Sequence, residues 1–121
     1  MEVIYQTKVN KLGPLVEEFY DEKMMILFKE DAPAELAEYC ILHSENNLNG
    51  EIKKGDTLQI DHHNYRITAV GSAVNKNLST LGHITLKFNG EEEPDLPGTL
   101  VLEEKEMNHV QVGNVIKISR D

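Results

Sequence analysis

Short stretches in which hydrophobic and polar residues alternate recur along the whole chain. Alternation with a period of two is typical of β-strands that turn one face toward a core. It is strictest in residues 83–88, where one face carries Ile84, Leu86 and Phe88 and the other carries His83, Thr85 and Lys87. Glycine, proline and asparagine separate these stretches and mark turns, about every 8–12 residues, which favours a small barrel or a pair of sheets.

This alternation predicts seven or eight strands. The clearest of them lie at residues 3–10, 24–28, 57–61, 65–70, 83–88, 99–103 and 115–119. Helical spacing is confined to residues 31–40, with Asp31 as the expected cap, and to residues 74–81, which end at Gly82. The first helix is expected to bury Leu36, Tyr39 and Cys40. We therefore expect an all-β fold, a small partly open barrel or sandwich with one or two short helices, formed by a single domain over residues 1–121.

A further strand is expected immediately before His43. Residues 39–42 are Tyr, Cys, Ile and Leu, so both faces of an extended chain would be hydrophobic and buried there. Residues 44–47 are Ser, Glu, Asn and Asn, which belong at the surface. His43 is thus placed where a buried strand emerges, held rigidly and still open to another molecule. A purely structural histidine is the commoner occupant of such a position.

The chain also contains one internal echo. Residues 55–60 (Gly-Asp-Thr-Leu-Gln-Ile) resemble residues 113–118 (Gly-Asn-Val-Ile-Lys-Ile). The match predicts two related strands that enter the barrel at equivalent positions.

Composition narrows the classes of partner. The chain has 121 residues, 21 of them acidic and 12 basic, for a formal net charge of -9. A nucleic-acid surface needs a basic patch, so this balance argues against one. It suits a protein partner with a positive docking face, or serves solubility alone. No segment has the pattern of a membrane span or signal peptide, and the lone Cys40 excludes an internal disulfide, so the expected location is cytoplasmic.

Candidate chemistry is limited to the histidines. Phosphate-binding glycine loops, a Walker lysine and a Gly-x-Ser-x-Gly elbow are all absent from the sequence. His62 and His63, at the tip of the expected 57–70 hairpin, are candidate zinc ligands. The paired spacing of structural zinc ligands is missing, so no metal and no cofactor are predicted. His109 is expected at the surface, and Cys40 is interpreted as a small buried hydrophobe.

His43 and His83 remain, each at a strand boundary beside a polar loop. If their strands are neighbours, the two imidazoles form a pair at one mouth of the barrel. Without a cofactor such a pair can transfer protons or attack phosphorus. Hydroxyl groups on Ser72 and Thr85, with loop N–H groups, would then hold the charged phosphoryl oxygens.

Several longer segments together resemble one family. They are residues 3–7, 28–30, 32–36, 38–43, 65–72, 77–78, 81–90 and 97–99. In these segments the sequence resembles the sorbitol (glucitol)-specific IIA component of the bacterial phosphoenolpyruvate-dependent sugar phosphotransferase system. Residues 91–94 and 102–112 look freer, and no functional inference is carried onto them.

The resemblance implies a cytoplasmic phosphocarrier. Its histidine would accept a phosphoryl group from phospho-HPr and pass it to a cysteine of the IIB component of a sorbitol (glucitol) permease. The family's phosphorylated residue falls on His43, with attachment expected at Nε2, and His83 is given a supporting role. Cys40 is not the transfer cysteine, because that residue belongs to another component. No Arg or Lys adjoins His43 in the sequence, which fits a site that shelters the phosphoryl group without trapping it.

Four alternatives stay open at this point. The chain could be a non-catalytic regulatory or binding domain with the same barrel, a zinc-dependent enzyme that uses the histidines, or a carrier phosphorylated on His83 instead of His43. An edge strand could also pair two copies into a homodimer. The sugar itself rests on the resemblance alone, since a IIA component does not touch it.

Overall fold

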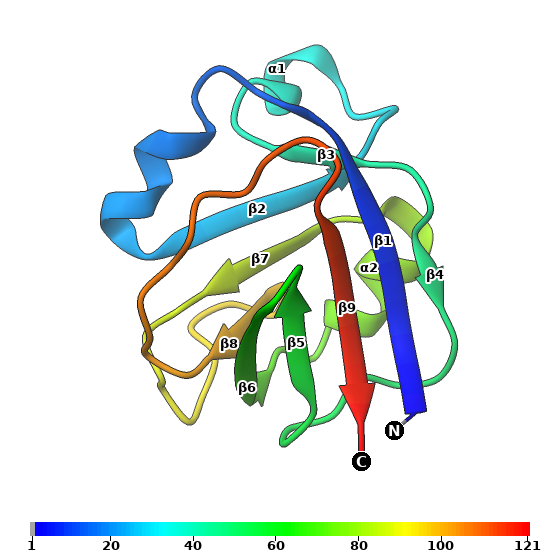
Figure 1. Cartoon of the computed structure of the whole chain (residues 1–121), viewed down its shortest axis with the longest axis vertical. Helices are drawn as coiled ribbons and strands as arrows, with labels where there is room; N and C mark the ends of the chain where they lie inside the picture. Colours follow the sequence, from blue (N-terminus) through cyan, green and yellow to red (C-terminus); the bar gives the residue numbers. More distant parts are fainter. Residues whose placement is uncertain (1) are drawn as a thin grey trace.

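Most of the molecule is a barrel of short strands (Figure 1). The computed structural model describes residues 2–121, and within that range the strands are β1 (Glu2–Leu12), β2 (Met24–Lys29), β3 (Ile41–His43), β4 (Asn47–Leu48), β5 (Thr57–Ile60), β6 (His63–Val70), β7 (Ile84–Lys87), β8 (Thr99–Leu102) and β9 (Val115–Arg120). Neighbours follow the order β3-β2-β7-β8-β6-β5-β9-β1-β4, and a further pairing of β1 with β3 closes all but β4 into a ring. The predicted all-β barrel is confirmed.

Alternation along the strands fills the barrel. The main core is made of aliphatic side chains and two buried tyrosines, among them Tyr5, Met25, Leu27, Ile41, Leu58, Tyr65, Ile67, Ile84, Leu86, Leu100, Ile116 and Ile118. Tyr65 packs edge-on against Phe88, with ring centroids 5.0 Å apart. A second, smaller cluster is formed by Phe28, Cys40 and Leu42. Because side chains of adjacent strand residues point to opposite faces, this cluster covers the outside of β2 and β3.

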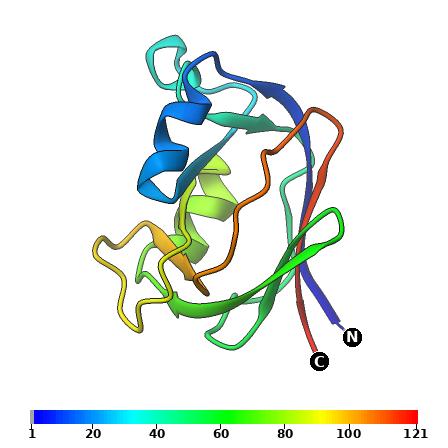
Figure 2. The same cartoon turned by 60° about the vertical axis from the view of Figure 1, so that its left-hand side comes forward.

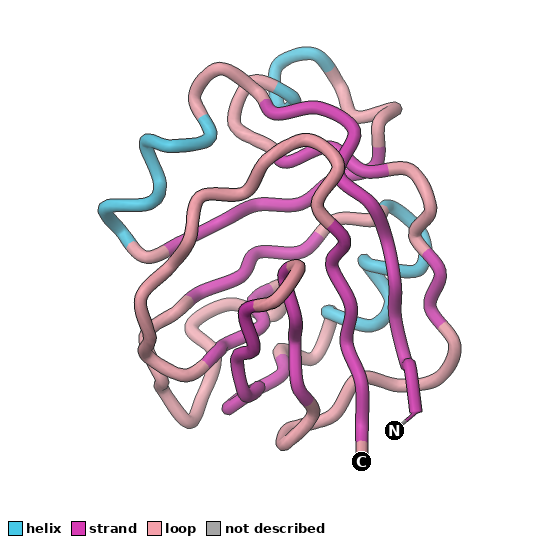
Figure 3. The backbone as a smooth tube through the Cα atoms, viewed as in Figure 1, coloured by secondary structure: helices cyan, strands magenta, loops and turns pink. Residues whose placement is uncertain are grey.

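Three short helical segments lie between the strands in the chain (Figure 3): η1 (Val16–Glu22, a 3-10 helix), α1 (Ala34–Ala37) and α2 (Val74–Leu81). α2 packs beside β4 and β7, with Val74 and Leu78 fully buried. It ends, as predicted, at Gly82, whose left-handed backbone (φ 62°) returns its N–H to the carbonyls of Asn77 and Leu78. None of the helices in residues 2–121 has the length and apolar character that spanning a membrane would require.

Several sequence-based expectations for the 31–40 region are wrong. Pro33, and not Asp31, precedes the first residue of α1, and no side chain caps that helix. Leu36 and Tyr39 are 46% and 38% exposed, whereas Cys40 is buried as expected. α1 is a single turn on the outside of the barrel, so it has no continuous inner face; Tyr39 packs instead on the Phe19 ring of η1. β4 was not predicted, because two residues are too short to show alternation.

The internal echo has a simple structural meaning. β5 and β9 are antiparallel neighbours, with Leu58 opposite Ile118 and Ile60 opposite Ile116. Each strand follows a glycine of positive φ, Gly55 at 95° and Gly113 at 96°. The prediction of two related strands entering the barrel equivalently is confirmed. Glu2 at the start of β1 pairs with Arg120 at the end of β9, so both termini lie at the same end of the molecule (Figure 2).

Candidate functional site

His43 is the last residue of β3, which lies between β1 and β2. It stands opposite Val9 in the antiparallel pairing with β1 and beside Lys29 in the parallel pairing with β2. Backbone pairing on both sides fixes the Cα of His43, so the predicted rigid placement at a strand end is confirmed. Lys29 also corrects the expectation of a site without nearby cations, because sequence neighbours do not reveal a residue brought in by strand register.

The imidazole of His43 is buried, with an exposed fraction of 0%. The expectation that this ring would be open to visiting proteins is therefore wrong for the described conformation. Its Nε2 lies 2.8 Å from the carbonyl oxygen of Gly82, and its Nδ1 lies 2.8 Å from Oγ1 of Thr7 on β1. The segment that follows α2 thus covers one ring nitrogen, and the barrel wall holds the other.

Gly82 approaches the ring so closely that only glycine fits. A Cβ at this position would overlap Cγ of Lys29 and lie 2.9 Å from Cε1 and 3.1 Å from Nε2 of His43. The positive φ of 62° also disfavours any residue with a side chain. Leu81, immediately before it, is 46% exposed, whereas Gly82 itself is buried over the ring.

Thr7 and Asn46 complete the surroundings of the imidazole. The Asn46 backbone N–H donates to Oγ1 of Thr7 at 2.9 Å, and the Asn46 side chain donates to the Leu78 carbonyl at 2.9 Å. Tyr5, two residues before Thr7 on the same face of β1, donates its hydroxyl to Oδ1 of Asn46 at 2.8 Å. None of Tyr5, Thr7 and Asn46 was predicted from the sequence as a component of the site. The available signal was a threonine on the inward face of a hydrophobic strand, where a hydroxyl needs a partner.

Burial lowers the pKa of His43 below its ordinary value, the hydrogen bond to the Gly82 carbonyl partly opposes that effect, and the charge of Lys29 adds to it. The ring is therefore neutral at pH 7. A neutral imidazole retains a lone pair, which a nucleophile toward phosphorus requires.

His83 begins the segment that leads into β7 and is half-buried. Its ring stacks on Phe28 of the outer cluster, with centroids 4.7 Å apart and an interplanar angle of 25°. Burial lowers the pKa of His83 as well. Since β2 separates β3 from β7 and His43 contacts the residue before His83, the two histidines are brought close together at one end of these strands. They differ in setting, because His43 faces inward and His83 lies on the outer surface.

The remaining candidates lie farther from the imidazole of His43. Ser72 is exposed before the first residue of α2, a helix length of about 12 Å from Gly82 at the other end. Thr85 is half-buried on β7 and shares the face of His83. Burial raises the pKa of the Cys40 thiol to about 11, so it stays protonated, in keeping with a buried hydrophobe. In residues 2–121, no three His, Cys, Asp or Glu side chains gather where they could hold a metal ion.

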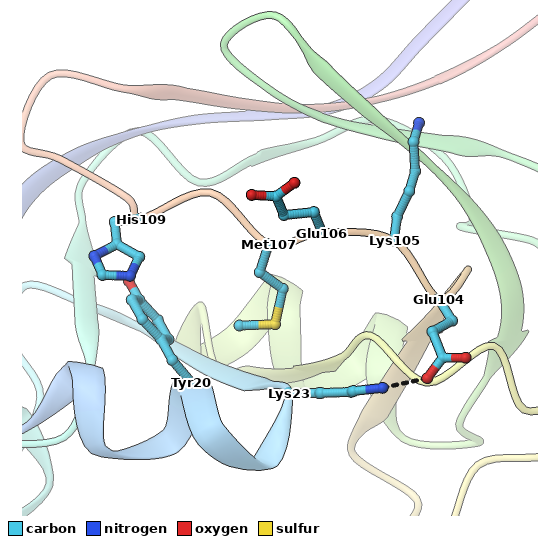
Figure 4. Close-up of a pocket in the computed structure, with 7 residues that line it drawn as sticks. All are labelled: Tyr20, Lys23, Glu104, Lys105, Glu106, Met107 and His109. Carbon is cyan, nitrogen blue, oxygen red and sulfur yellow. Dashed lines mark hydrogen bonds and ion pairs between the residues drawn. The ribbon is translucent and has the colours of Figure 1, made fainter.

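A cavity of about 500 Å³ lies between η1 and the segment after β8 (Figure 4). Its lining is Tyr20, Lys23, Glu104, Lys105, Glu106, Met107 and His109. His109 is exposed, as expected, and stacks on Tyr20 at 4.7 Å, while Lys23 is paired with Glu104. None of these residues contacts His43 through a hydrogen bond, so this cavity is separate from the histidine site.

Comparison with known proteins agrees with the geometry. Residues 4–117 match the family described as PTS system glucitol/sorbitol-specific IIA component. Two curated relatives, from Shigella flexneri and Escherichia coli K12, carry the name PTS system glucitol/sorbitol-specific EIIA component; each is 38% identical over 117 residues, covering 97% of this chain and 95% of the relative. A crystal structure of a PTS system IIA component from Enterococcus faecalis V583 superposes with a TM-score of 0.78 at 31% identity, covering 92% of this chain and 96% of that one. This chain therefore belongs to the glucitol/sorbitol-specific IIA components of the phosphotransferase system.

Proposed function

We propose that this protein carries a phosphoryl group on His43, taken from phospho-HPr and delivered to the cysteine of the IIB component of a sorbitol permease. The observation that carries the proposal is a buried imidazole at the end of β3, in a chain that matches a IIA family almost from end to end. The proposed place of action is the cytoplasm.

The reaction needs only the side chain of His43 and two protein partners. The lone pair of Nε2 attacks phosphorus, the N–P bond in phospho-HPr breaks, and its electron pair returns to the HPr histidine; the ring of His43 gives up its Nδ1 proton to solvent, which balances the proton that the HPr histidine takes up. In the second step the IIB thiolate attacks phosphorus, the electron pair of the His43 N–P bond returns to Nε2, and the ring regains one proton from solvent. Alignment of donor, phosphorus and acceptor supplies most of the rate in such transfers.

Access to Nε2 requires movement. The Gly82 carbonyl oxygen lies 2.8 Å from Nε2, which leaves no room for a phosphorus atom between them. The proposal therefore includes displacement of residues 81–83 when a partner docks. Leu81 is exposed, whereas Gly82 is buried and His83 leads directly into β7, so docking has to loosen the end of α2 and the start of β7 together.

His83 is a second candidate for the phosphorylated residue, because it is the more exposed of the two histidines. Its stacking on Phe28 leaves part of the ring at the surface, in direct reach of a partner. In the preferred proposal His43 is phosphorylated, and His83, the residue after Gly82, supports the transfer.

Intact-mass measurement after incubation with phosphoenolpyruvate, Enzyme I and HPr tests the proposal. The wild-type chain should gain one phosphate, and His83→Ala and the surface control His109→Ala should gain it too. His43→Gln, which keeps a polar side chain in the buried site, should gain none while retaining its circular-dichroism spectrum. Loss of phosphate only in His83→Ala would move the role to His83, and no gain in the wild type would favour a non-catalytic binding domain.

A further inference from the structure

The protonation state of His43 can be read from its hydrogen-bond partners. A backbone carbonyl oxygen only accepts hydrogen bonds, so the 2.8 Å contact with Gly82 requires a proton on Nε2. A neutral ring carries one proton, so Nδ1 holds a lone pair and must accept. The hydroxyl of Thr7, 2.8 Å away, is its donor.

Thr7 can donate its hydroxyl hydrogen to the ring because a different group donates a hydrogen bond to its oxygen. The Asn46 N–H donates to Oγ1 of Thr7, which leaves the hydroxyl hydrogen for Nδ1 of His43. A buried chain thus runs from the Asn46 N–H through Thr7 to the ring and on to the Gly82 carbonyl. No buried side-chain nitrogen or oxygen in residues 2–121 lacks a partner, so this assignment leaves nothing unsatisfied.

The resting tautomer has a consequence for the proposed reaction. With its proton on Nε2, the ring has no lone pair at the nitrogen that must attack phosphorus. When residues 81–83 move, Nε2 can release that proton to entering water, and Nδ1 can take one up. Nδ1–H then needs an acceptor, and the Thr7 oxygen is the atom already facing it.

The Thr7 oxygen can also accept a hydrogen bond from the ring. A hydroxyl oxygen carries two lone pairs, and the Asn46 N–H uses only one of them. Rotation of one O–H bond therefore converts Thr7 from a donor toward Nδ1 into an acceptor from Nδ1–H.

We propose that Thr7 is a positioning residue for His43: its hydroxyl supports the Nε2–H tautomer at rest and, by turning its hydrogen away from the ring, supports the Nδ1–H tautomer that exposes the Nε2 lone pair. The first half concerns the free protein and stands alone. The second half rests on the proposed phosphocarrier function.

Nitrogen-15 NMR of the histidine rings tests the first half on the wild-type protein. We expect His43 to show a protonated Nε2 and an unprotonated Nδ1. A proton on Nδ1 in the resting protein would overturn the assignment, whatever the phosphorylation assay gives.

Variants at position 7 test the second half. Thr7→Val keeps the shape and removes the hydroxyl, so Nδ1 of His43 loses its partner; its nitrogen-15 shift should move, and phosphorylation by phospho-HPr should slow about tenfold or more, the size expected for one lost hydrogen bond. Thr7→Ser restores a hydroxyl and should recover both the Nδ1 shift and the rate. Thr99→Val, at a second buried threonine that does not contact His43, is the matched control and should alter neither.

A wild-type Nδ1 shift and a wild-type rate in Thr7→Val would overturn the role of Thr7. If Thr7→Val fails to fold, Thr7→Ser and the wild-type spectrum still decide the assignment, since a shifted tautomer in Thr7→Ser contradicts it. Failure of the wild type to accept phosphate would instead refute the proposed function, and the NMR result would then judge the resting tautomer by itself.

Discussion

At the scale of single residues, the site depends on one glycine and one threonine as much as on the histidine. Gly82 lets a carbonyl oxygen reach Nε2 of His43, and Thr7 engages Nδ1. Both contacts join residues more than 30 positions apart in the chain, so neither leaves a short motif in the sequence. Pairings of this kind follow from strand register, which local patterns do not encode.

Gly82→Ala should destabilise the protein by about 2–4 kcal/mol, because a Cβ would overlap Lys29 and crowd His43 in addition to the cost of a positive φ. Urea denaturation measures the change. Gly90→Ala is the matched control: its φ of 69° is similar, but a Cβ there would come only to 3.2 Å from the Glu104 nitrogen. A loss at Gly82 no larger than that at Gly90 would show that the approach to His43 is not tight.

The lowered pKa of His43 predicts an acid-sensitive stability. A histidine that is harder to protonate in the folded state than in the unfolded one stabilises the fold fully above about pH 6.5, and this contribution falls as pH drops from there toward the folded-state pKa. His83 adds to the loss in the same window, since burial lowers its pKa too.

Unfolding free energies measured between pH 7.5 and about pH 5 should therefore decline less steeply in His43→Gln than in the wild type. A wild-type slope retained in His43→Gln would mean that folding does not lower the pKa of His43.

At the scale of elements, the periodic segments were predictable and the irregular ones were not. The strands at residues 57–60, 84–87 and 99–102 and the helix at 74–81 were anticipated to within two residues, because alternation and a closing glycine mark them. α1 and β4 lack any period long enough to detect. The burial of His43 also escaped prediction, because it depends on where the end of α2 lies relative to β3.

α2 is the element that holds Gly82 over the imidazole. Leu78 is fully buried, and its carbonyl accepts from Asn46, whereas Leu81 on the next turn is 46% exposed. Leu78→Ala should cost about 2–5 kcal/mol through the cavity it leaves. Leu81→Ala should change stability by no more than about 0.5 kcal/mol.

Thermal or urea unfolding of the two leucine variants compares them directly. Similar losses at positions 78 and 81 would contradict the described orientation of α2. Hydrogen exchange at the Gly82 amide should also accelerate in Leu78→Ala, because that N–H bonds to the Leu78 carbonyl.

At the scale of the whole molecule, the barrel supplies the frame and the net charge bears on how a partner would dock. The net charge of -9 suits a partner with a basic docking face. A relay between proteins needs weak and fast docking, for which a small interface is sufficient.

The second-order rate of phosphorylation by phospho-HPr should therefore fall as salt rises from about 0.01 M to about 1 M, since screening shortens the reach of the attraction from about 30 Å to about 3 Å. Stopped-flow or quenched-flow kinetics over a salt series measures it. A rate that is flat or rises with salt would mean that charge complementarity plays no part in docking.

The most direct test of the account is the position of the phosphoryl group after the chain has been charged by phosphoenolpyruvate, Enzyme I and HPr. Phosphorus-31 and nitrogen-15 NMR of the labelled protein identify both the residue and the nitrogen. We predict one phosphoramidate, on Nε2 of His43. A phosphoryl group on His83, or on no histidine at all, would contradict it.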